Sequence, residues 1–226
     1  MDSVYACDLR RREELRDLKP TPGYCIFIDI VNSVALKDEG LSAWCDAMFR
    51  VVGKSRNWLD YFGDEENNKP DDFFLQQRGL LPLKIMGDCI MFYIPETTMP
   101  PHVSAMSLFS SLQYIIREYP RPEVRIAATF CEDAYAITFV EGTNDIHGKD
   151  IDLTARLLKE ANPQEIVMNE AFVWKARPVF EGRWSNHDFR EFGEVIGPCP
   201  TSLKGFKRPE KIYRWPGPRF ESNGSS

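Results

Sequence analysis

The chain has 226 residues, a formal net charge of −6 at pH 7 and an apolar fraction of 43%. That length is enough for one well-packed domain, and the net negative charge argues against a nucleic-acid backbone as partner. No run approaches the roughly 20 apolar residues that span a bilayer, so we expect no direct membrane contact. The six cysteines form no CxxC pair, and the charged N-terminus has no apolar core, so we expect a cytoplasmic protein without a signal peptide.

We expect one domain over residues 22–216, preceded by an N-terminal arm at 1–21 and followed by a disordered tail at 217–226. Residues 23–31, GYCIFIDIV, are almost wholly apolar and rich in β-branched and aromatic side chains, which predicts a central strand buried on both faces. Asp29 interrupts this run. A carboxylate there is costly unless it is paired or binds a metal, and capping of a neighbouring backbone amide explains it equally well.

The middle of the chain predicts two helices. Apolar residues recur near helical spacing over 40–61, and Pro100 and Pro101 precede a second helix over 102–118. Residues 62–80 lose this periodicity and gain charge, which predicts a surface insertion longer than most connections.

The stretch 81–96, LPLKIMGDCIMFYIPE, predicts a β-hairpin because two apolar runs flank the pair Gly87-Asp88. Asp88 would stand exposed at the end of a rigid sheet, which suits a metal ligand, and Lys84 precedes the turn. Turn chemistry alone also explains a lone Gly-Asp pair. Cys89 is either a core thiol or a sensor of oxidation.

The remaining elements alternate between strands and one long helix. The predicted segments are strands at 123–130 and 135–140, a helix from 149 to about 161, a strand at 165–168, a helical turn at 171–175, and strands at 191–196 and 211–215. This order predicts an α+β fold in which helices flank a mixed central sheet.

Two carboxylates, Asp29 and Asp88, are expected near the ends of adjacent strands. With a backbone carbonyl such as that of Ile30, they make a hard, oxygen-rich site suited to Mg²⁺ or Mn²⁺. A pair of such ions supports phosphoryl or nucleotidyl transfer.

The helix after Gly148 places Asp152 and Arg156 on one face. They form either a surface salt bridge or an arginine directed at a phosphate beside a carboxylate directed at a sugar. Lys204 is either a solvated turn lysine or a point charge for a phosphate. Asp145 and His147 precede the helix, and His147 is more simply a loop histidine than a base or ligand.

Four segments in this order, FIDIVNS, KIMGD, DIHGKDIDLTAR and LKG, together resemble the catalytic domain of class III nucleotidyl cyclases, the family of adenylyl and guanylyl cyclases. The resemblance covers roughly residues 22–215. It implies the ferredoxin-like class III cyclase fold and a head-to-tail homodimer with active sites between the two chains. It also implies conversion of a nucleoside triphosphate to a 3′,5′-cyclic nucleotide and pyrophosphate.

The resemblance also implies a role for each matching position. Asp29, Asp88 and the carbonyl of Ile30 match the metal site, which would take two Mn²⁺ or Mg²⁺ ions from one chain's residues. The partner chain would supply Lys84 and Asp145 to read the base, Asp152 to orient the ribose, Arg156 to stabilise the transition state, and Lys204 to hold the terminal phosphates. Phe27 is assigned to substrate binding on the same resemblance.

The sequence departs from the family pattern at Asp152, where the family usually has asparagine in a VNxAxR-like run. Aspartate can accept a hydrogen bond from a ribose hydroxyl but cannot donate one. The 62–80 insertion is a second departure, because compact family members have a shorter segment there.

Lys84 donates and Asp145 accepts, which disfavours guanine and leaves adenine, cytosine and uracil open. The IDLTAR run and the insertion resemble the stand-alone bacterial pyrimidine cyclases of Pycsar antiphage systems. This resemblance implies that UTP or CTP becomes cyclic UMP or cyclic CMP, which triggers a separate effector protein that responds to the cyclic nucleotide. Adenylate cyclase is the alternative, and an inactive cyclase-like domain that binds a nucleotide or a partner is the alternative of another class.

Overall fold

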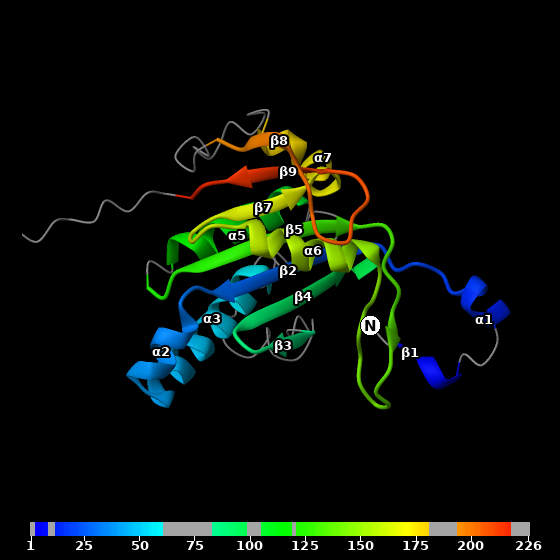
Figure 1. Cartoon of the computed structure of the whole chain (residues 1–226), viewed down its shortest axis with the longest axis horizontal. Coiled ribbons are helices and arrows are strands. Elements are labelled where there is room, and N and C mark those ends of the chain that lie inside the picture. The colour runs from blue at the N-terminus through cyan, green and yellow to red at the C-terminus, as the bar shows by residue number, and fades with distance from the viewer. Residues whose placement is uncertain are drawn as a thin grey trace, which may run out of the picture.

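The computed structural model describes residues 3–8, 12–60, 83–98, 105–118, 121–180 and 194–217. Its centre is a seven-stranded sheet in the order β3-β4-β2-β5-β7-β9-β8 (Figure 1). In that order, the strands are Lys84–Met86, Cys89–Pro95, Gly23–Ile30, Val124–Cys131, Ile166–Asn169, Glu210–Trp215 and Ile196–Thr201. Neighbouring strands are antiparallel except β5 and β7, which are parallel. The predicted α+β class with a mixed sheet is confirmed.

β2 is the central strand that its sequence predicts. It pairs with β4 on one side and β5 on the other, and Asp29 is its only residue that is not fully buried. Because side chains alternate across a sheet, Ile26 and Ile28 join one core cluster while Cys25 and Phe27 join the other. The strand is therefore apolar throughout, except where it reaches the end of the sheet.

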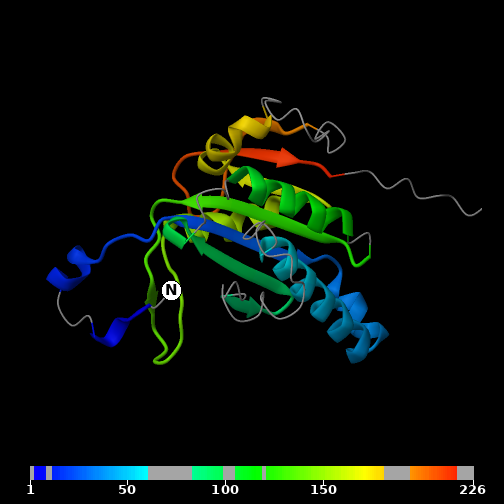
Figure 2. The same ribbon diagram turned by 180° about the vertical axis from the view of Figure 1, so that it is seen from behind.

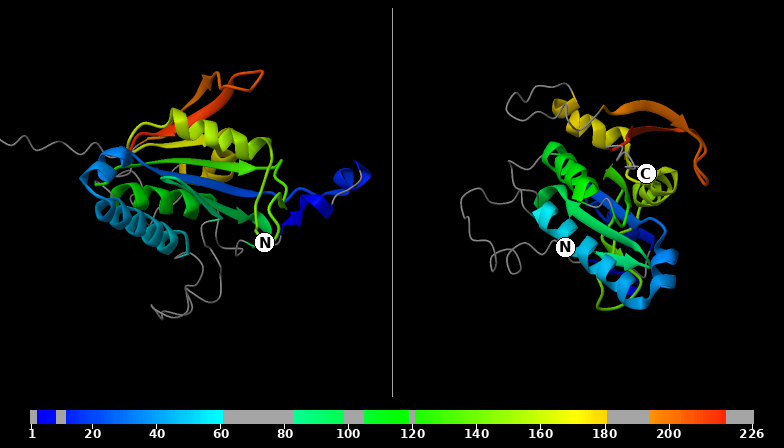
Figure 3. Two further views of the ribbon diagram at one scale, coloured as in Figure 1. Left: turned by 60° about the horizontal axis from the view of Figure 1, so that its bottom comes forward. Right: turned by 90° about the vertical axis from the view of Figure 1, so that its left-hand side faces the viewer.

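Helices cover both faces of the sheet, as Figures 2 and 3 show. On one face lie α3 (Leu41–Asp60), α5 (Ala105–Glu118) and α7 (Glu170–Phe180), which contribute apolar side chains to the first core cluster. On the other face lies α6 (Lys149–Glu160), which contributes to the second. The three long predicted helices are thus confirmed as α3, α5 and α6, although residues 102–104 lie outside the described part of the chain.

The predicted hairpin is confirmed as β3 and β4, which are antiparallel and pair Met86 with Cys89. Gly87 has φ 65°, a left-handed conformation that glycine adopts without steric cost. This geometry leaves Asp88 as the last residue of a two-residue turn.

Three predicted elements differ from the structure. Strand 135–140 is reduced to β6 (Ile137–Thr138), which leaves the main sheet and pairs in parallel with β1 (Val4–Tyr5). The turn at 171–175 is part of the longer helix α7.

Of the strand predicted at 191–196, residues 191–193 lie outside the described part of the chain, and the strand found nearby is β8, Ile196–Thr201, which overlaps the prediction only at Ile196. Its two prolines argue against a strand in the sequence, but β8 is an edge strand, where a missing amide donor is tolerated.

Three further elements were not predicted as such: α2 (Ser33–Glu39) and the short 3₁₀ turns Ala6–Asp8 and Glu96–Thr98. The segment expected as an N-terminal arm contains β1 and the short helix α1 (Arg12–Asp17). The predicted insertion at 62–80 and nearly all of the predicted tail lie outside the described residues. Within the described part, no helix combines the length and apolarity needed to cross a bilayer.

Candidate active site

Asp29 and Asp88 lie at the same end of the sheet, as the sequence predicts. Asp29 is opposite Cys89 in the register of β2 and β4, and the Ile30 amide donates to the Asp88 carbonyl oxygen at 3.3 Å. The side chain of Asp29 is 16% exposed and that of Asp88 is 19% exposed. The two carboxylates therefore come from adjacent elements and have limited access to water. Asp88 is less exposed than its turn position predicts, because side chains of α2 and α3 pack against it.

Each of these carboxylates is bound by a cation of the same chain. Arg125, on β5, donates from Nε to Asp29 Oδ2 at 2.8 Å, and its Nη2 lies 2.7 Å from the same oxygen. Lys37, on α2, donates from Nζ to Asp88 Oδ1 at 2.7 Å. The indole of Trp44 also donates to Asp88 Oδ1, at 2.9 Å, and the hydroxyl of Ser33 donates to Oδ2.

These surroundings shift the two pKa values in opposite directions. Burial raises the pKa of Asp29, and the hydrogen bond from Arg125 opposes this shift without cancelling it. Burial also acts to raise the pKa of Asp88, but the hydrogen bonds from Lys37, Ser33 and Trp44 outweigh it and hold that pKa below its ordinary value. Asp88 therefore stays ionised to a lower pH than Asp29.

The donor set at this end of the sheet fits a divalent cation. Carboxylate oxygens are the ligands that Mg²⁺ and Mn²⁺ prefer, and both carboxylates already attract positive charge from Lys37 and Arg125. Within the described ranges, no group of three or more His, Cys, Asp or Glu side chains gathers around a metal-sized space. A metal here would thus depend on Asp29, Asp88 and backbone oxygen such as that of Ile30, with further positions left to a substrate.

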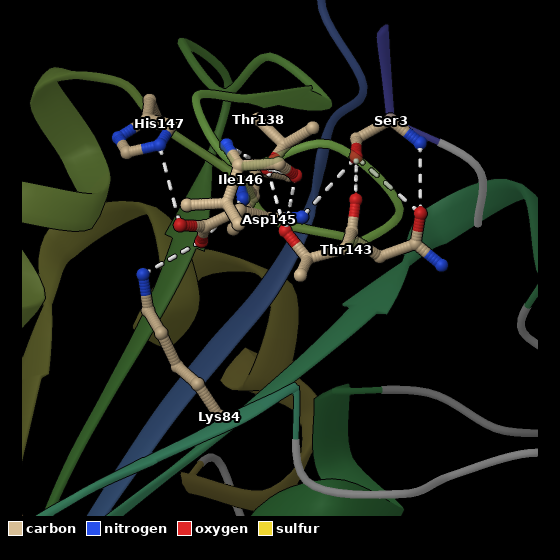
Figure 4. Close-up of polar contacts among 9 residues, drawn as sticks. Ser3, Lys84, Thr138, Thr143, Asp145, Ile146 and His147 are labelled. Atoms are coloured by element: carbon tan, nitrogen blue, oxygen red, sulfur yellow. Dashed lines mark hydrogen bonds and ion pairs between the residues drawn. The ribbon is translucent and has the colours of Figure 1, made fainter. Parts of the chain in front are cut away.

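Lys84 and Asp145 meet on one chain although they come from distant elements. Figure 4 shows the Lys84 side chain reaching from β3 to the loop before α6, where its Nζ donates to Asp145 Oδ1 at 2.6 Å. The Ile146 amide donates to the same oxygen at 2.8 Å, and His147 Nε2 lies 3.3 Å from Oδ2. Both members of the ion pair remain partly exposed, with 31% and 24% of their side chains accessible.

Asp152, Arg156 and Lys204 line one cleft, of about 680 Å³, between α6 and the loop that joins β8 to β9. The other lining residues are Lys149, Gly205, Phe206, Lys207, Arg208 and Glu210, so five cationic side chains face two carboxylates. A cleft with this balance of charge can bind a polyphosphate. Among the ion pairs of the described residues, none joins Asp152 to Arg156, so the surface salt bridge that their spacing allows is not formed.

The helix α6 presents these residues because its sequence is amphipathic. Its buried side chains include Leu153, Leu157 and Leu158, which pack in the second core cluster. Asp152 and Arg156, one turn apart, lie on the opposite, accessible side. The core therefore fixes the direction in which both polar side chains point.

Phe27 has a different environment from the other predicted site residues. Only 4% of its surface is exposed, and it belongs to the second core cluster beneath α6. A direct contact between Phe27 and a substrate stays a prediction. Cys89 is half-buried, and burial raises its pKa to about 12.

The partners of the two carboxylates are not among the residues predicted from the sequence. Arg125 is a charged residue inside an apolar strand and lies directly opposite Asp29 in the β2–β5 register. A charge in such a strand requires a partner, so this residue carried a usable signal. Lys37 and Trp44 carried none, because their contact with Asp88 depends on how α2 and α3 pack.

In one chain, the predicted site residues thus form three separate groups. They are the carboxylates Asp29 and Asp88, the ion pair Lys84–Asp145, and the cleft of Asp152, Arg156 and Lys204. None of the residues that line the cleft comes from the first two groups.

Comparison of the sequence with models of known protein families gave no match, and no curated protein matches it. Solved structures do match. The adenylyl cyclase CyaB from P. aeruginosa is similar at 16% identity and a TM-score of 0.62, over 88% of this chain and 95% of that chain. An adenylate cyclase from Trypanosoma brucei, solved in its monomeric state, is similar at 17% identity and a TM-score of 0.59, over 91% and 96%.

The guanylyl cyclase Cya2 is similar at 18% identity and a TM-score of 0.58, over 91% of this chain and 97% of that chain. These matches span nearly the whole length of both chains. At these sequence identities they show a shared fold alone. The described elements, a mixed sheet with helices on both faces, agree with them. The chain therefore has the fold of adenylyl and guanylyl cyclase catalytic domains, as the sequence motifs predict.

Proposed function

We propose that the chain is a cytoplasmic nucleotidyl cyclase that converts a nucleoside triphosphate to a 3′,5′-cyclic nucleotide and pyrophosphate. The observation that carries this proposal is the cationic cleft, in which Arg156 of α6 and Lys204 of the β8–β9 loop face the same space. The two residues belong to separate motifs of the sequence. Their convergence on a fold shared with adenylyl and guanylyl cyclases supports a site for a triphosphate.

The active form in this proposal is a head-to-tail homodimer. Asp29 and Asp88 lie outside the cleft that holds Arg156 and Lys204, which supports a site in which a second chain brings the carboxylates to the phosphates. Large apolar side chains are exposed beside the Lys84–Asp145 pair, which suits a surface covered by a partner. They are Ile85 at 52%, Met86 at 42%, Phe139 at 67% and Val140 at 63%.

In the proposed reaction, Lys84 donates to the base and Asp145 accepts from it, while Asp152 accepts a hydrogen bond from a ribose hydroxyl. Lys204 holds the terminal phosphates. The ribose 3′-oxygen attacks the α-phosphorus, the bond to the bridging oxygen of the pyrophosphate breaks, and the 3′-hydroxyl proton passes to solvent. Arg156 stabilises the negative charge that develops on the α-phosphate.

Asp29, Asp88 and the carbonyl of Ile30 would hold Mn²⁺ or Mg²⁺, two ions per site. When bound, such a metal would supply Lewis-acid chemistry, which would ease deprotonation of the ribose 3′-hydroxyl and offset the charge of the leaving pyrophosphate. The chain's own contribution is to keep the two carboxylates together at the end of the sheet. Binding of a metal there would require Lys37 and Arg125 to release the carboxylate oxygens that they now contact.

We propose a pyrimidine nucleotide, UTP or CTP, as the substrate, and antiphage signalling through a separate effector protein as the role. The donor Lys84 and acceptor Asp145 suit uracil, cytosine and adenine better than guanine. The IDLTAR run, with Asp152 in place of the usual asparagine, supports a pyrimidine. Conversion of ATP to cyclic AMP is the alternative that the same pair allows.

A product assay tests the activity and the base together. Purified protein with Mn²⁺ is given ATP, GTP, CTP and UTP separately, and the products are identified by mass spectrometry. Cyclic UMP or cyclic CMP supports the pyrimidine cyclase, whereas cyclic AMP as the main product keeps the cyclase and overturns the base. Asp88→Asn is the matched control, since it removes one charge and keeps the shape of the side chain.

Absence of product from every nucleotide, in a protein that still binds one, would favour an inactive cyclase-like domain. Asp152→Asn is then the informative variant. In either case the proposed activity of the original chain fails. Restored turnover would identify Asp152 as the residue that blocks the reaction, and no turnover would place the cause elsewhere in the site.

A further inference from the structure

The loop that carries Asp145 is exposed over most of its length. Residues 139–144 are all exposed, and Phe139 and Val140 are 67% and 63% accessible. A loop of this kind samples many conformations unless hydrogen bonds restrict it. The position of Asp145 relative to Lys84 therefore depends on whatever fixes this loop.

The interior of the loop is fixed by threonine side chains. The hydroxyl oxygens of Thr138 and Thr143 lie 2.8 Å from each other and 3.1 and 2.7 Å from the Val140 carbonyl oxygen, so the two hydroxyl protons are shared among these three contacts. The C-terminal side of Asp145 is fixed by the backbone bridge between Tyr135 and His147, whose two hydrogen bonds measure 2.7 and 3.0 Å. These contacts shape the loop but do not hold the amide of Asp145 itself.

The N-terminal segment supplies that contact, as Figure 4 shows. The Asp145 amide donates to Ser3 Oγ at 3.3 Å. Ser3 Oγ lies 3.1 Å from the Thr143 carbonyl oxygen and 3.3 Å from Asn144 Oδ1, either of which can accept its proton, and the Ser3 amide donates to Asn144 Oδ1 at 3.1 Å. Ser3 thus contacts three consecutive residues that end at Asp145.

Ser3 is itself held in place by the strand that follows it. Val4 and Tyr5 form β1, which pairs in parallel with β6, and the Val4 amide donates to the Ala136 carbonyl oxygen at 2.9 Å. The same β6 begins the loop that returns to Asp145. The two-stranded sheet therefore aligns Ser3 with the far end of the loop.

We propose that Ser3 is a positioning residue of the nucleotide site, which holds the 139–145 loop so that the Asp145 carboxylate meets Lys84 and the base. This inference rests on the proposed function for its effect on substrate, whereas the contact between Ser3 and the loop stands independently. The N-terminal segment is, in this proposal, part of the site rather than an appended arm.

The contact is tested first in the protein without nucleotide, by measuring the hydrogen-exchange rates of individual backbone amides with NMR. Ser3→Ala removes the acceptor of the Asp145 amide, and we expect that amide to exchange roughly five-fold faster, as loss of one net hydrogen bond implies. The His147 amide, bonded to Tyr135, should keep its rate. Ser3→Thr retains the hydroxyl and should exchange like the original protein, and Ser42→Ala, at an exposed position of α3, controls for the substitution itself. An unchanged Asp145 rate in Ser3→Ala overturns the proposal.

The consequence for substrate is tested with the same variants. Ser3→Ala should raise the KM for the preferred nucleotide roughly five-fold with little change in kcat, and it should reduce discrimination between bases. Faster exchange with unchanged KM and unchanged base preference would make Ser3 a structural contact only and overturn its role in the site. If the original protein turns over no nucleotide, the proposed function fails, and the exchange rates still decide whether Ser3 holds Asp145.

Discussion

Lys37 lies where a divalent cation would approach Asp88, so its replacement tests the carboxylate pair as a metal site. Its ammonium group is 2.7 Å from Asp88 Oδ1, and its position over the Trp44 ring, 5.1 Å from the ring centroid, keeps it beside that carboxylate. A metal ion that binds Asp88 must displace this ammonium group. Lys37→Met removes the competing charge and retains a long apolar side chain that can still lie against Trp44.

The size of the effect follows from the exposure of the pair. The Lys37 side chain is 42% exposed and that of Asp88 is 19% exposed, so solvent screens the interaction only in part. Ion pairs near a protein surface contribute up to about 1 kcal/mol, and release of that amount corresponds to an increase of about five-fold in metal affinity. Loss of the repulsion between the ammonium group and the metal acts in the same direction.

The assay is titration of the protein with Mn²⁺ near neutral pH without nucleotide, with free Mn²⁺ measured by electron paramagnetic resonance. Lys159→Met is the matched control, because Lys159 is an exposed lysine in the last turn of α6 and its loss changes the net charge equally. Asp88→Asn should abolish the tight binding. Equal or weaker Mn²⁺ binding by Lys37→Met, relative to the control, would refute the reasoning that Lys37 occupies the place of a metal.

Three further predictions concern assembly, reactivity and acid stability. Asp88→Asn and Arg156→Met should each be inactive alone, but an equal mixture should recover about a quarter of the original activity, because mixed dimers contain one intact site; no recovery would contradict a shared site. Iodoacetamide at about pH 8 should label the exposed Cys7 well before Cys89, whose pKa burial raises to about 12, and equal labelling by peptide mass spectrometry would contradict this. The lowered pKa of Asp88 gives a contribution to stability that is present above its unfolded pKa and lost as the pH falls below about 4. The free energy of unfolding, measured by chemical denaturation at a series of pH values, should therefore fall more steeply with decreasing pH for the original protein than for Asp88→Asn. Parallel pH dependences would exclude such a contribution.

The elements that sequence predicts well are those whose pattern extends over many residues. β2, α3 and α6 each carry a long apolar run or stripe, and the glycine and aspartate of the β3–β4 turn mark a reversal. β1 was not predicted, and β6 was predicted as the longer strand 135–140, because each contributes only two residues and their pairing depends on a contact between distant parts of the chain. No local pattern encodes such a pair.

The same distinction applies to the candidate site. Asp29, Asp88 and Arg156 follow from motifs, whose spacing along the chain is visible in the sequence. Lys37 and Ser3 reach their partners through helix packing and through a two-residue sheet, which only the folded arrangement defines. Sequence thus identifies the residues of a motif more readily than the residues that contact and orient them in the folded chain.

Neighbouring residues of α6 have different roles: some pack in the core and others line the cleft. Leu153 and Leu157 are held by the core, whereas Asp152 and Arg156 lie at the cleft and contribute little to that core. Substitutions at the cleft positions can therefore alter what the cleft binds while the domain retains its stability. Substitutions at the leucines would instead lower the stability of the domain. This separation makes the accessible side of α6 a favourable place to vary the proposed ribose and phosphate contacts, because libraries restricted to it should yield mostly folded proteins.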